Sequence, residues 1–216
     1  MTPLPNTKRL TCATCMRPQS NCICQWIAPV AHRVEVIILQ HPQEVANAKG
    51  SARLLHLSLP HSRLVTGEVF AAQTLQTLLS APLYPGFAAH SPRHAILLYP
   101  DTLQGGALGM QASPVLAPAL LREPSRLRLI VVDGTWRKSR KMLYLNPLLQ
   151  QLPRLSLRDM PATRYRIRKA HRPDQLSTLE ATCAALMQLE ASVERFQPLL
   201  TAFDGFVAQQ AGYRTK

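Results

Sequence analysis

The sequence "LRLIVVDGTWRKSR", Leu127–Arg140, joins an apolar run to an acid, a glycine, a hydroxyl and an indole. The run Leu127–Val132 is short, rich in aliphatic residues and not alternating, which is typical of a strand buried on both faces. Such strands occur in parallel sheets covered by helices on both sides. The cations that follow predict a basic helix directly behind the strand: Arg137, Lys138, Arg140 and Lys141.

Two further apolar runs have the same character. "VEVIIL" covers Val34–Leu39 and "AILLY" covers Ala95–Tyr99, whereas "RLSL", Arg154–Leu157, is a weaker candidate strand. Segments with helical spacing lie between and after these runs: Glu44–Ser58, Glu68–Ser80, Arg137–Leu149 and Ser177–Phe196. The last of them opens with Ser177 and Glu180 at the spacing of a capping box. Strands that alternate with helices predict an α/β fold with a largely parallel sheet and flanking helices.

Four of the five cysteines lie in one short N-terminal segment, in the pattern C-x2-C-x6-C-x-C: Cys12, Cys15, Cys22 and Cys24. Four thiolates can surround one Zn²⁺ tetrahedrally, and so short a segment would take its folding energy from the metal. A disulfide pair is disfavoured in a chain without a secretion signal, and a redox C-x2-C normally follows a strand. Structural zinc is therefore the prediction, with an iron–sulfur cluster left open.

Charge is the strongest global feature, since 25 Lys and Arg residues face 12 Asp and Glu residues, a formal net charge of +13. A chain this basic usually binds a polyanion, with nucleic acid as the first candidate and an anionic membrane surface as the second. The length of 216 residues, 46% of them hydrophobic, fits a zinc-binding segment (residues 1–30) and one α/β domain (residues 31–216). The sequence has neither a long apolar run nor a secretion signal, so a cytoplasmic location is expected.

Each predicted strand ends in a polar cluster. "QHPQE" follows the first strand, Pro100 and Asp101 follow the second, and Asp133–Trp136 follows the third. The carboxyl ends of parallel strands face one crevice in which ligands bind, so these clusters predict one site. The alternative is that strand ends are polar only because loops are solvated. Asp133 would then be a helix cap, Gly134 a flexible turn residue and Trp136 a core residue.

A second basic block, Arg154–Arg172, contains a single acid, Asp159. Within it, Arg164, Arg166 and Arg168 alternate with uncharged residues. In an extended segment these three guanidinium groups would point to one side, where they could pair with phosphates. In a helix or loop they would be ordinary surface charges. The sequence predicts a nucleic-acid track formed by these arginines with other cations of the chain: Lys169, Arg137, Lys138 and Lys141.

The order of these motifs resembles that of DTW-domain proteins. The cysteine cluster is followed by "HPQE" at His41–Glu44, "YP" at Tyr99–Pro100, "DGTW" at Asp133–Trp136 and "STLEA" at Ser177–Ala181. Each piece alone is a weak signal, but the combination is specific and covers nearly the whole chain. The resemblance implies a fold related to the SPOUT class, with a C-terminal knotted region.

The same resemblance implies a tRNA-uridine aminocarboxypropyltransferase. Such enzymes transfer the 3-amino-3-carboxypropyl group of S-adenosylmethionine to N3 of a uridine, in bacteria typically in the tRNA variable loop, and release methylthioadenosine. Asp133 would be the essential acid, either as the general base or as the group that orients the amino group of the donor. The remaining residues implied to cradle the cofactor are His41, Glu44, Tyr99, Pro100, Asp101, Gly134, Thr135, Trp136, Ser177, Thr178 and Glu180.

One position departs from the family pattern. An Asn-Thr pair commonly follows H-P-x-E, whereas this chain has Gly50 and Ser51. Ser51 can replace a threonine hydroxyl, but Gly50 cannot replace an amide. Two other functions stay open. The first is a SPOUT-type RNA methyltransferase, which attacks another carbon of the same cofactor, and the second is a non-catalytic zinc-containing RNA-binding protein.

Overall fold

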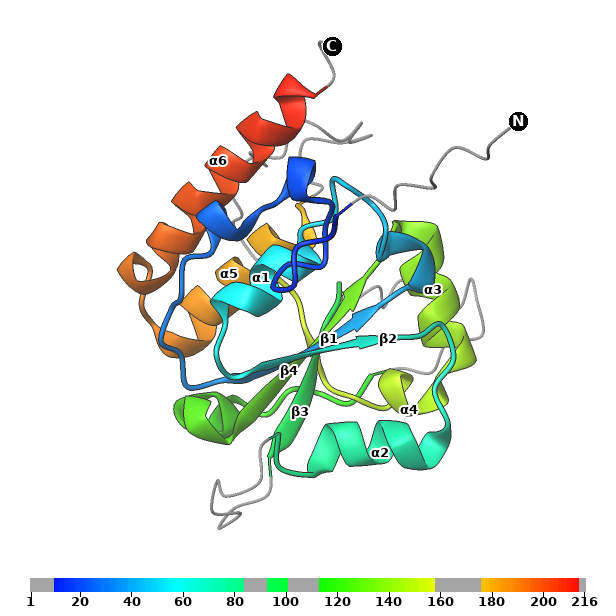
Figure 1. Ribbon diagram of the computed structural model, residues 1–216. Coiled ribbons are helices and arrows are strands. Elements are labelled where there is room, and N and C mark those ends of the chain that lie inside the picture. The colour runs from blue at the N-terminus through cyan, green and yellow to red at the C-terminus, as the bar shows by residue number, and fades with distance from the viewer. Residues whose placement is uncertain (1–9, 84–92, 101–112, 158–175, 214–216) are drawn as a thin grey trace, which may run out of the picture.

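The computed structural model describes residues 10–83, 93–100, 113–157 and 176–213, which form a five-stranded parallel sheet between two layers of helices (Figure 1). The strands are β1 (Glu35–Gln40), β2 (Ser62–Thr66), β3 (His94–Leu98), β4 (Leu127–Asp133) and β5 (Arg154–Leu155). Their order is β2-β1-β4-β3-β5, and each neighbouring pair is parallel. The predicted α/β class is confirmed, whereas the knotted path stays a prediction.

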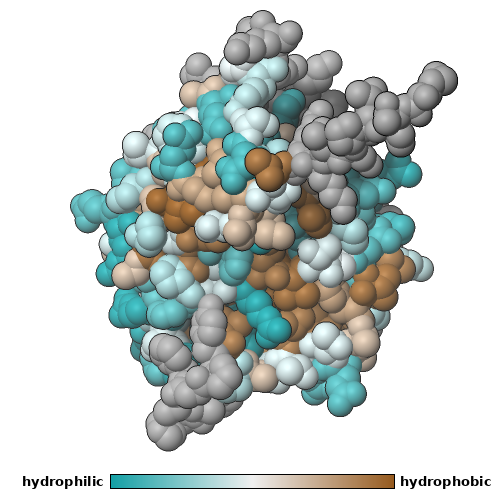
Figure 2. Space-filling model, in the orientation of Figure 1, coloured by the Kyte–Doolittle hydropathy of each residue, from teal (hydrophilic) through white to brown (hydrophobic). Residues whose placement is uncertain are grey.

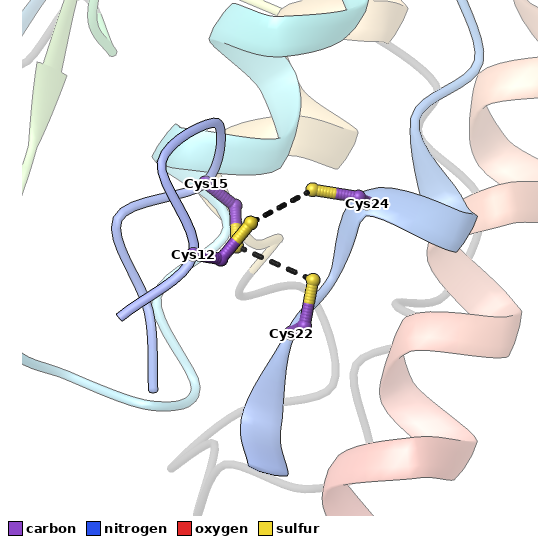
Figure 3. Close-up of side chains that lie close together, drawn as sticks. All are labelled: Cys12, Cys15, Cys22 and Cys24. Carbon is purple, nitrogen blue, oxygen red and sulfur yellow. Dashed lines mark hydrogen bonds between the residues drawn. The ribbon is translucent and has the colours of Figure 1, made fainter. Parts of the chain in front are cut away.

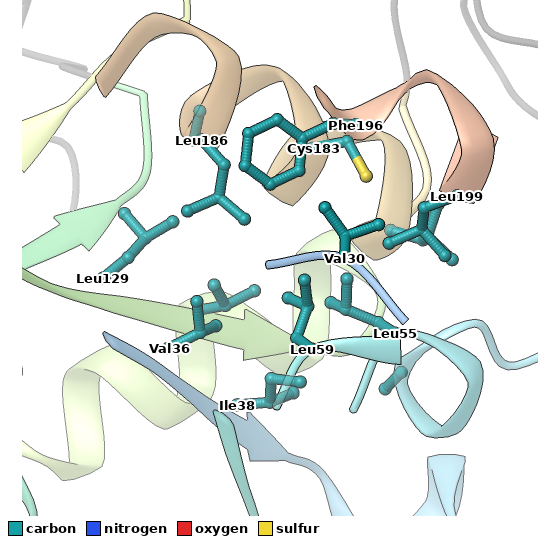
Figure 4. Packing of buried hydrophobic residues seen from close by; sticks show 14 of the residues in the cluster. Val30, Val36, Ile38, Leu55, Leu59, Leu129, Cys183, Leu186, Phe196 and Leu199 are labelled. Atoms are coloured by element: carbon teal, nitrogen blue, oxygen red, sulfur yellow. The ribbon is translucent and has the colours of Figure 1, made fainter. Parts of the chain in front are cut away.

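The central strands send alternate side chains into two cores. Val36 and Ile38 of β1 enter the larger core, whose packing is shown in Figure 4, and Ile37 and Leu39 enter the smaller one. The larger core lies under α1 (Ala52–Ser58), α5 (Thr178–Glu190) and α6 (Gln197–Gly212). The smaller core lies under α2 (Ala72–Ser80), α3 (Trp136–Leu145) and α4 (Pro147–Gln150). None of the described helices is both long and apolar enough to cross a bilayer.

Short 3-10 helices complete the described chain: Gln19–Asn21, Cys24–Trp26, Pro42–Glu44, Pro118–Arg122, Pro124–Arg126 and Glu194–Phe196. All four predicted helices differ from the observed ones in their bounds. The helix predicted from Glu68 begins at Ala72, and the helix predicted over Arg137–Leu149 is divided at Asn146 into α3 and α4. The helix predicted from Glu44 begins only at Ala52, because Asn47 accepts a hydrogen bond from its own loop, at Lys49 N. The helix predicted to run to Phe196 ends at Glu190, where Ala191 adopts the left-handed conformation (φ 50°).

The edge strand β2 was not predicted. One of its residues is buried, two are half-buried and two are exposed, because β2 pairs only with β1 in the sheet. Hydrophobic residues nevertheless gather over this edge on the face shown in Figure 2. A strand with this mixed burial lacks the continuous apolar run by which the three central strands are identified.

The centre of the sheet holds a topological switch point. β1 and β4 are neighbours, but β1 leads to α1 on one face of the sheet and β4 leads to α3 on the other. Adjacent strands whose connections diverge in this way leave a crevice at their carboxyl ends. Gln40 and Asp133, the last residues of the two strands, are partners in register at this crevice.

Candidate functional site

Asp133 lies at the switch point with its carboxylate buried between β1 and α5. The Gln40 amide donates to Oδ2 at 2.9 Å, and the Thr178 hydroxyl donates to Oδ1 at 2.6 Å. One carboxylate thus joins the end of β1, the end of β4 and the first residue of α5. Each carboxylate oxygen accepts one of these two hydrogen bonds, which fixes the carboxylate at the carboxyl edge of the sheet.

The turn after Asp133 packs closely against the first turn of α3 and against His41. Thr135, not Asp133, is the N-cap of α3, and its hydroxyl accepts from Lys138 N at 3.3 Å. The alternative in which Asp133 caps this helix is therefore wrong. A Cβ added at Gly134 would lie 3.2 Å from the Lys138 Cβ and 3.7 Å from the His41 Cβ. Gly134 has no left-handed φ, so it serves close packing rather than a flexible turn.

The aromatic residues of this edge form a pair of unequal exposure. Trp136 is 48% exposed and Tyr99 is 6% exposed. Their rings meet edge to face, with centroids 5.6 Å apart and planes at 75°. Trp136 is therefore not the core residue of the alternative interpretation, and its free ring surface is available for stacking.

The segment after β1 holds its histidine and its acid by defined hydrogen bonds. Gln43 N–H donates to His41 Nδ1 at 3.2 Å, so Nε2 carries the proton of the neutral ring and donates to Glu68 Oε1 at 2.9 Å. The buried Glu44 accepts from Lys138 Nζ and from Asn47 Nδ2, both at 2.8 Å. His41 and Glu44 therefore lie at the crevice, where they also order the loop.

The cations at the start of α3 differ in what they can contribute to RNA binding. Lys138 pairs with Glu44, and Lys141 Nζ donates to Glu68 Oε2 at 3.0 Å. The hydrogen bond from His41, followed by that from Lys141, lowers the pKa of Glu68. Arg137 is exposed. The other predicted members of the nucleic-acid track lie outside the described residues: Arg164, Arg166, Arg168 and Lys169. Asp101, which was predicted to contact the cofactor, also lies outside them.

The start of α5 confirms the predicted capping box. Ser177 N donates to Glu180 Oε2 at 2.8 Å, and Glu180 N donates to the Ser177 hydroxyl at 3.2 Å. Ser51 Oγ accepts from Leu179 N at 3.3 Å. Gly50 and Ser51 are the two residues that differ from the family pattern. The Ser51 hydroxyl thus has a structural role at the helix start from which Thr178 contacts Asp133.

Arg154 is a residue of this edge that sequence reasoning assigned only to the basic block. It is the first residue of β5 and is 8% exposed. Its guanidinium carbon lies 5.9 Å from the centroid of the Tyr99 ring. Its position at the start of a weak candidate strand was the only signal in the sequence, because burial of a charged residue depends on tertiary packing.

The four N-terminal cysteines converge on one point (Figure 3). Their sulfur atoms all lie within 4.8 Å of one another, with Cys12–Cys24 at 3.6 Å and Cys15–Cys22 at 3.8 Å. Tetrahedral Zn–S bonds of about 2.3 Å place sulfurs about 3.8 Å apart, so the cluster could hold such a metal. Backbone N–H groups of Cys15 and Thr14 lower the pKa of Cys12 to about 6, whereas burial raises that of Cys24 to about 12.

The cysteine segment is fastened to the α/β domain on two sides. Arg17 donates to the carbonyl oxygens of Ala48 at 2.5 Å and Gly50 at 2.8 Å, in the loop that follows Glu44. On the other side, the Trp26 indole donates to Gln209 of α6. A Cβ at Gly205 would lie 2.1 Å from the Trp26 ring, so this glycine is required for the contact.

Comparison with known proteins places this geometry in a family. The family model of the DTW domain matches residues 9–211, nearly the whole chain. The chain belongs to the DTW domain family. Its D-x-T-W signature is therefore Asp133–Trp136, and this signature lies at the switch point of the sheet. No solved structure matches the chain.

Several curated relatives of this DTW domain carry one activity in their names. It is 27% identical to tRNA-uridine aminocarboxypropyltransferase 2 of Macaca fascicularis, over 86% of this chain and 58% of that protein. The Drosophila melanogaster protein of the same name is 27% identical over 91% and 73%. tRNA-uridine aminocarboxypropyltransferase A of Arabidopsis thaliana is 30% identical over 63% and 51%. The chain thus spans less than two thirds of the macaque protein.

Proposed function

We propose that this DTW domain transfers the 3-amino-3-carboxypropyl group of S-adenosylmethionine to N3 of a tRNA uridine. The observation that carries the proposal is the buried Asp133 carboxylate at the switch point, tied to Gln40 and Thr178. A carboxylate fixed at the carboxyl edge of a parallel sheet, where ligands bind, can accept a proton from a substrate or pair with an ammonium group. The names of the relatives supply the reaction and the substrate class.

The reaction assigns a balanced task to the site. A bond forms between uridine N3 and the donor Cγ, and the bond between Cγ and the sulfonium sulfur breaks. Its electron pair stays on sulfur, so neutral methylthioadenosine leaves. The N3 proton goes to a base, and we assign Asp133 either this proton or the donor's ammonium group. Selection of Cγ over the methyl carbon is positional, because the nucleophile reaches only the carbon held near it.

The other motif residues would hold the donor around this carboxylate. His41, Glu44, Tyr99 and Pro100 come from two strand ends. Gly134, Thr135, Trp136, Ser177, Thr178 and Glu180 come from the starts of α3 and α5. The side chains of Thr135, Ser177 and Glu180 form helix caps. We therefore propose that they hold the backbone of the two helix starts in position around the donor and do not contact it through their side chains. Exposed Arg137 would contact the phosphates of tRNA.

Mass analysis of tRNA nucleosides tests this function. The purified protein is incubated with unmodified tRNA and S-adenosylmethionine, and the tRNA is digested. The expected product is a uridine heavier by one aminocarboxypropyl group, with one methylthioadenosine released for each product. A uridine heavier by one methyl group would instead indicate an RNA methyltransferase. Retained tRNA binding without any product would indicate the non-catalytic binding protein.

We further propose that the four-cysteine cluster holds structural zinc. Its support is the spacing of the sulfur atoms and the attachment of the segment to the loop after Glu44 through Arg17. We expect one zinc per chain in metal analysis, and we expect Cys22→Ser to lose that zinc and to lower the melting temperature. The control is Cys183→Ala, since this buried thiol lies in the core outside the cluster. Full zinc content in Cys22→Ser would contradict the proposal.

A further inference from the structure

Arg154 is a buried cation, and part of its hydrogen-bonding capacity is unused among the described residues. Its Nε and Nη2 atoms are buried, and no acceptor contacts them in the part of the chain that the structure describes. A buried charge costs free energy unless it is paired and hydrogen-bonded. The guanidinium carbon lies 5.9 Å from the centroid of the Tyr99 ring, and this cation–π contact offsets part of the cost. The contact does not replace the hydrogen bonds that the two nitrogens lack.

The hydroxyl of Tyr99 is a second unused donor at the same place. It is buried and makes no hydrogen bond of normal geometry among the described residues, although the Ser139 hydroxyl lies close enough to interact with it. Burial raises the pKa of Tyr99, whereas the interaction with Ser139 and the charges of Arg140 and Arg154 lower it by less. The hydroxyl therefore keeps its proton near neutral pH and can donate it to an acceptor. Two buried side chains in contact thus present three polar atoms, and all three can act as donors.

Among the described residues, no acceptor forms a hydrogen bond of normal geometry with these three atoms. Arg154 pairs in register with Leu97, and Tyr99 follows β3 directly. Both therefore stand at the carboxyl edge of the sheet, and Tyr99 contacts Trp136 of the D-x-T-W signature. Converging donors with a positive charge at a ligand-binding edge fit an anion that has at least two acceptor oxygens.

We propose that Arg154 and Tyr99 bind the α-carboxylate of the aminocarboxypropyl donor. This inference rests on the proposed function, because that carboxylate belongs to the group that is transferred. A planar carboxylate matches the guanidinium fork and accepts a third hydrogen bond from the tyrosine. A phosphate of RNA offers the same chemistry. However, Arg154 is only 8% exposed, and such a site admits the small end of a ligand more readily than a polynucleotide backbone.

The test compares two donors on the folded full-length chain. Calorimetry measures the binding of S-adenosylmethionine and of decarboxylated S-adenosylmethionine, which lacks only the carboxylate. The variants are Arg154→Gln and Tyr99→Phe, with Arg122→Gln as the control because Arg122 is exposed. We expect the unaltered protein and the control to prefer the carboxylated donor by about 10- to 100-fold. Arg154→Gln should lose most of this preference and keep only the several-fold part due to Tyr99, and Tyr99→Phe should lose several-fold in affinity for the carboxylated donor alone.

Each outcome has one meaning. An unchanged preference for the carboxylated donor in both Arg154→Gln and Tyr99→Phe overturns the inference, even if the unaltered protein forms the tRNA product. Weaker tRNA binding in Arg154→Gln, with a reduced salt dependence and unchanged donor preference, would assign the site to an RNA phosphate and also overturn it. If the unaltered protein binds the donor with this preference but forms no product on tRNA, the proposed function fails and the carboxylate site stands.

Discussion

Two buried arginines, one at each end of the sheet, differ in their hydrogen bonding. Arg128, at the start of β4, is fully buried and donates twice to Glu35 Oε2, at 2.9 Å and 2.6 Å. It also donates to the carbonyl oxygens of Leu78 and Ala81, both at 2.7 Å. Arg154, near the carboxyl edge, has two buried nitrogens without a partner among the described residues. Among the described residues the amino end also has one such atom, Arg126 Nε, but the guanidinium of Arg128 is held by a carboxylate and two carbonyl oxygens, whereas Arg154 and Tyr99 together leave three atoms without a partner.

This difference separates folding from binding. The hydrogen-bonded charges at the amino end connect β4 to β1 and to the end of α2, and so stabilise the sheet. Unused buried donors at the carboxyl end reduce the stability of the free protein, and we attribute their presence to the proposed ligand. Substitutions at the amino end should therefore change stability, and those at the carboxyl end should change ligand binding and chemistry.

The largest expected effect on stability is that of Glu35→Ala. It leaves the Arg128 charge buried without its carboxylate, which costs about 3–5 kcal/mol. Urea unfolding measures the loss. The matched control is Glu123→Ala, because Glu123 has a 61% exposed side chain and only a 3.5 Å contact with Arg126. The control should change the free energy of unfolding by less than about 0.5 kcal/mol. Equal effects of the two substitutions would contradict the account of the amino end.

A smaller effect of opposite sign is expected for Arg154→Met. Replacing a buried, unpartnered cation by an apolar side chain should stabilise the free protein by about 1 kcal/mol, after the loss of the contact with Tyr99. The same change should weaken the binding of the donor. Urea unfolding without ligand measures the first effect, and calorimetry measures the second. A destabilisation comparable to that of Glu35→Ala would show that Arg154 is a structural cation like Arg128.

The smallest expected effect is a pH dependence at the amino end. Burial lowers the pKa of His32, whose Nδ1 donates to Val34 O at 2.7 Å and whose Nε2 accepts from His61 N at 3.1 Å. The unfolded chain therefore binds a proton at higher pH than the folded one. Stability is fully present above the unfolded pKa of about 6.5 and decreases as the pH falls below it.

Unfolding in urea at several pH values between 7 and 5 measures this slope. His32→Asn keeps a donor for Val34 O but does not titrate, so it should show a flatter pH dependence of stability. Some slope should remain, because burial also lowers the pKa of His56. An unchanged slope in His32→Asn would exclude His32 as its source.

The parts of the fold that were predicted from sequence are those with a strong local signal. The three central strands are continuous apolar runs, and Ser177 and Glu180 form the predicted capping box. Helix α6 was not predicted, because Gly205 interrupts its pattern. The structure shows that this glycine accommodates the Trp26 ring, a contact between distant parts of the chain.

The site was predictable in outline and not in detail. The predicted strand ends do meet at one edge of the sheet, where Gln40 and Asp133 are neighbours, because the carboxyl ends of parallel strands converge. The role of Asp133 stays a prediction. The pairing of Lys138 with Glu44 and the burial of Arg154 depend on contacts between elements far apart in sequence. No local pattern reports such contacts, so the sequence predicts nucleic-acid binding for Lys138, and for Arg154 only a place in the basic block and in a weak candidate strand.

The central claim is that Asp133 serves chemistry at the carboxyl edge, and Asp133→Asn tests it most directly. Asparagine keeps an acceptor for Thr178 or Gln40, so the fold should persist in circular dichroism. Nucleoside mass analysis should then show at least about a 100-fold slower formation of aminocarboxypropyl-uridine. The control Asp204→Asn, on α6, should form product at the unaltered rate. Near-normal product formation by folded Asp133→Asn would contradict the account.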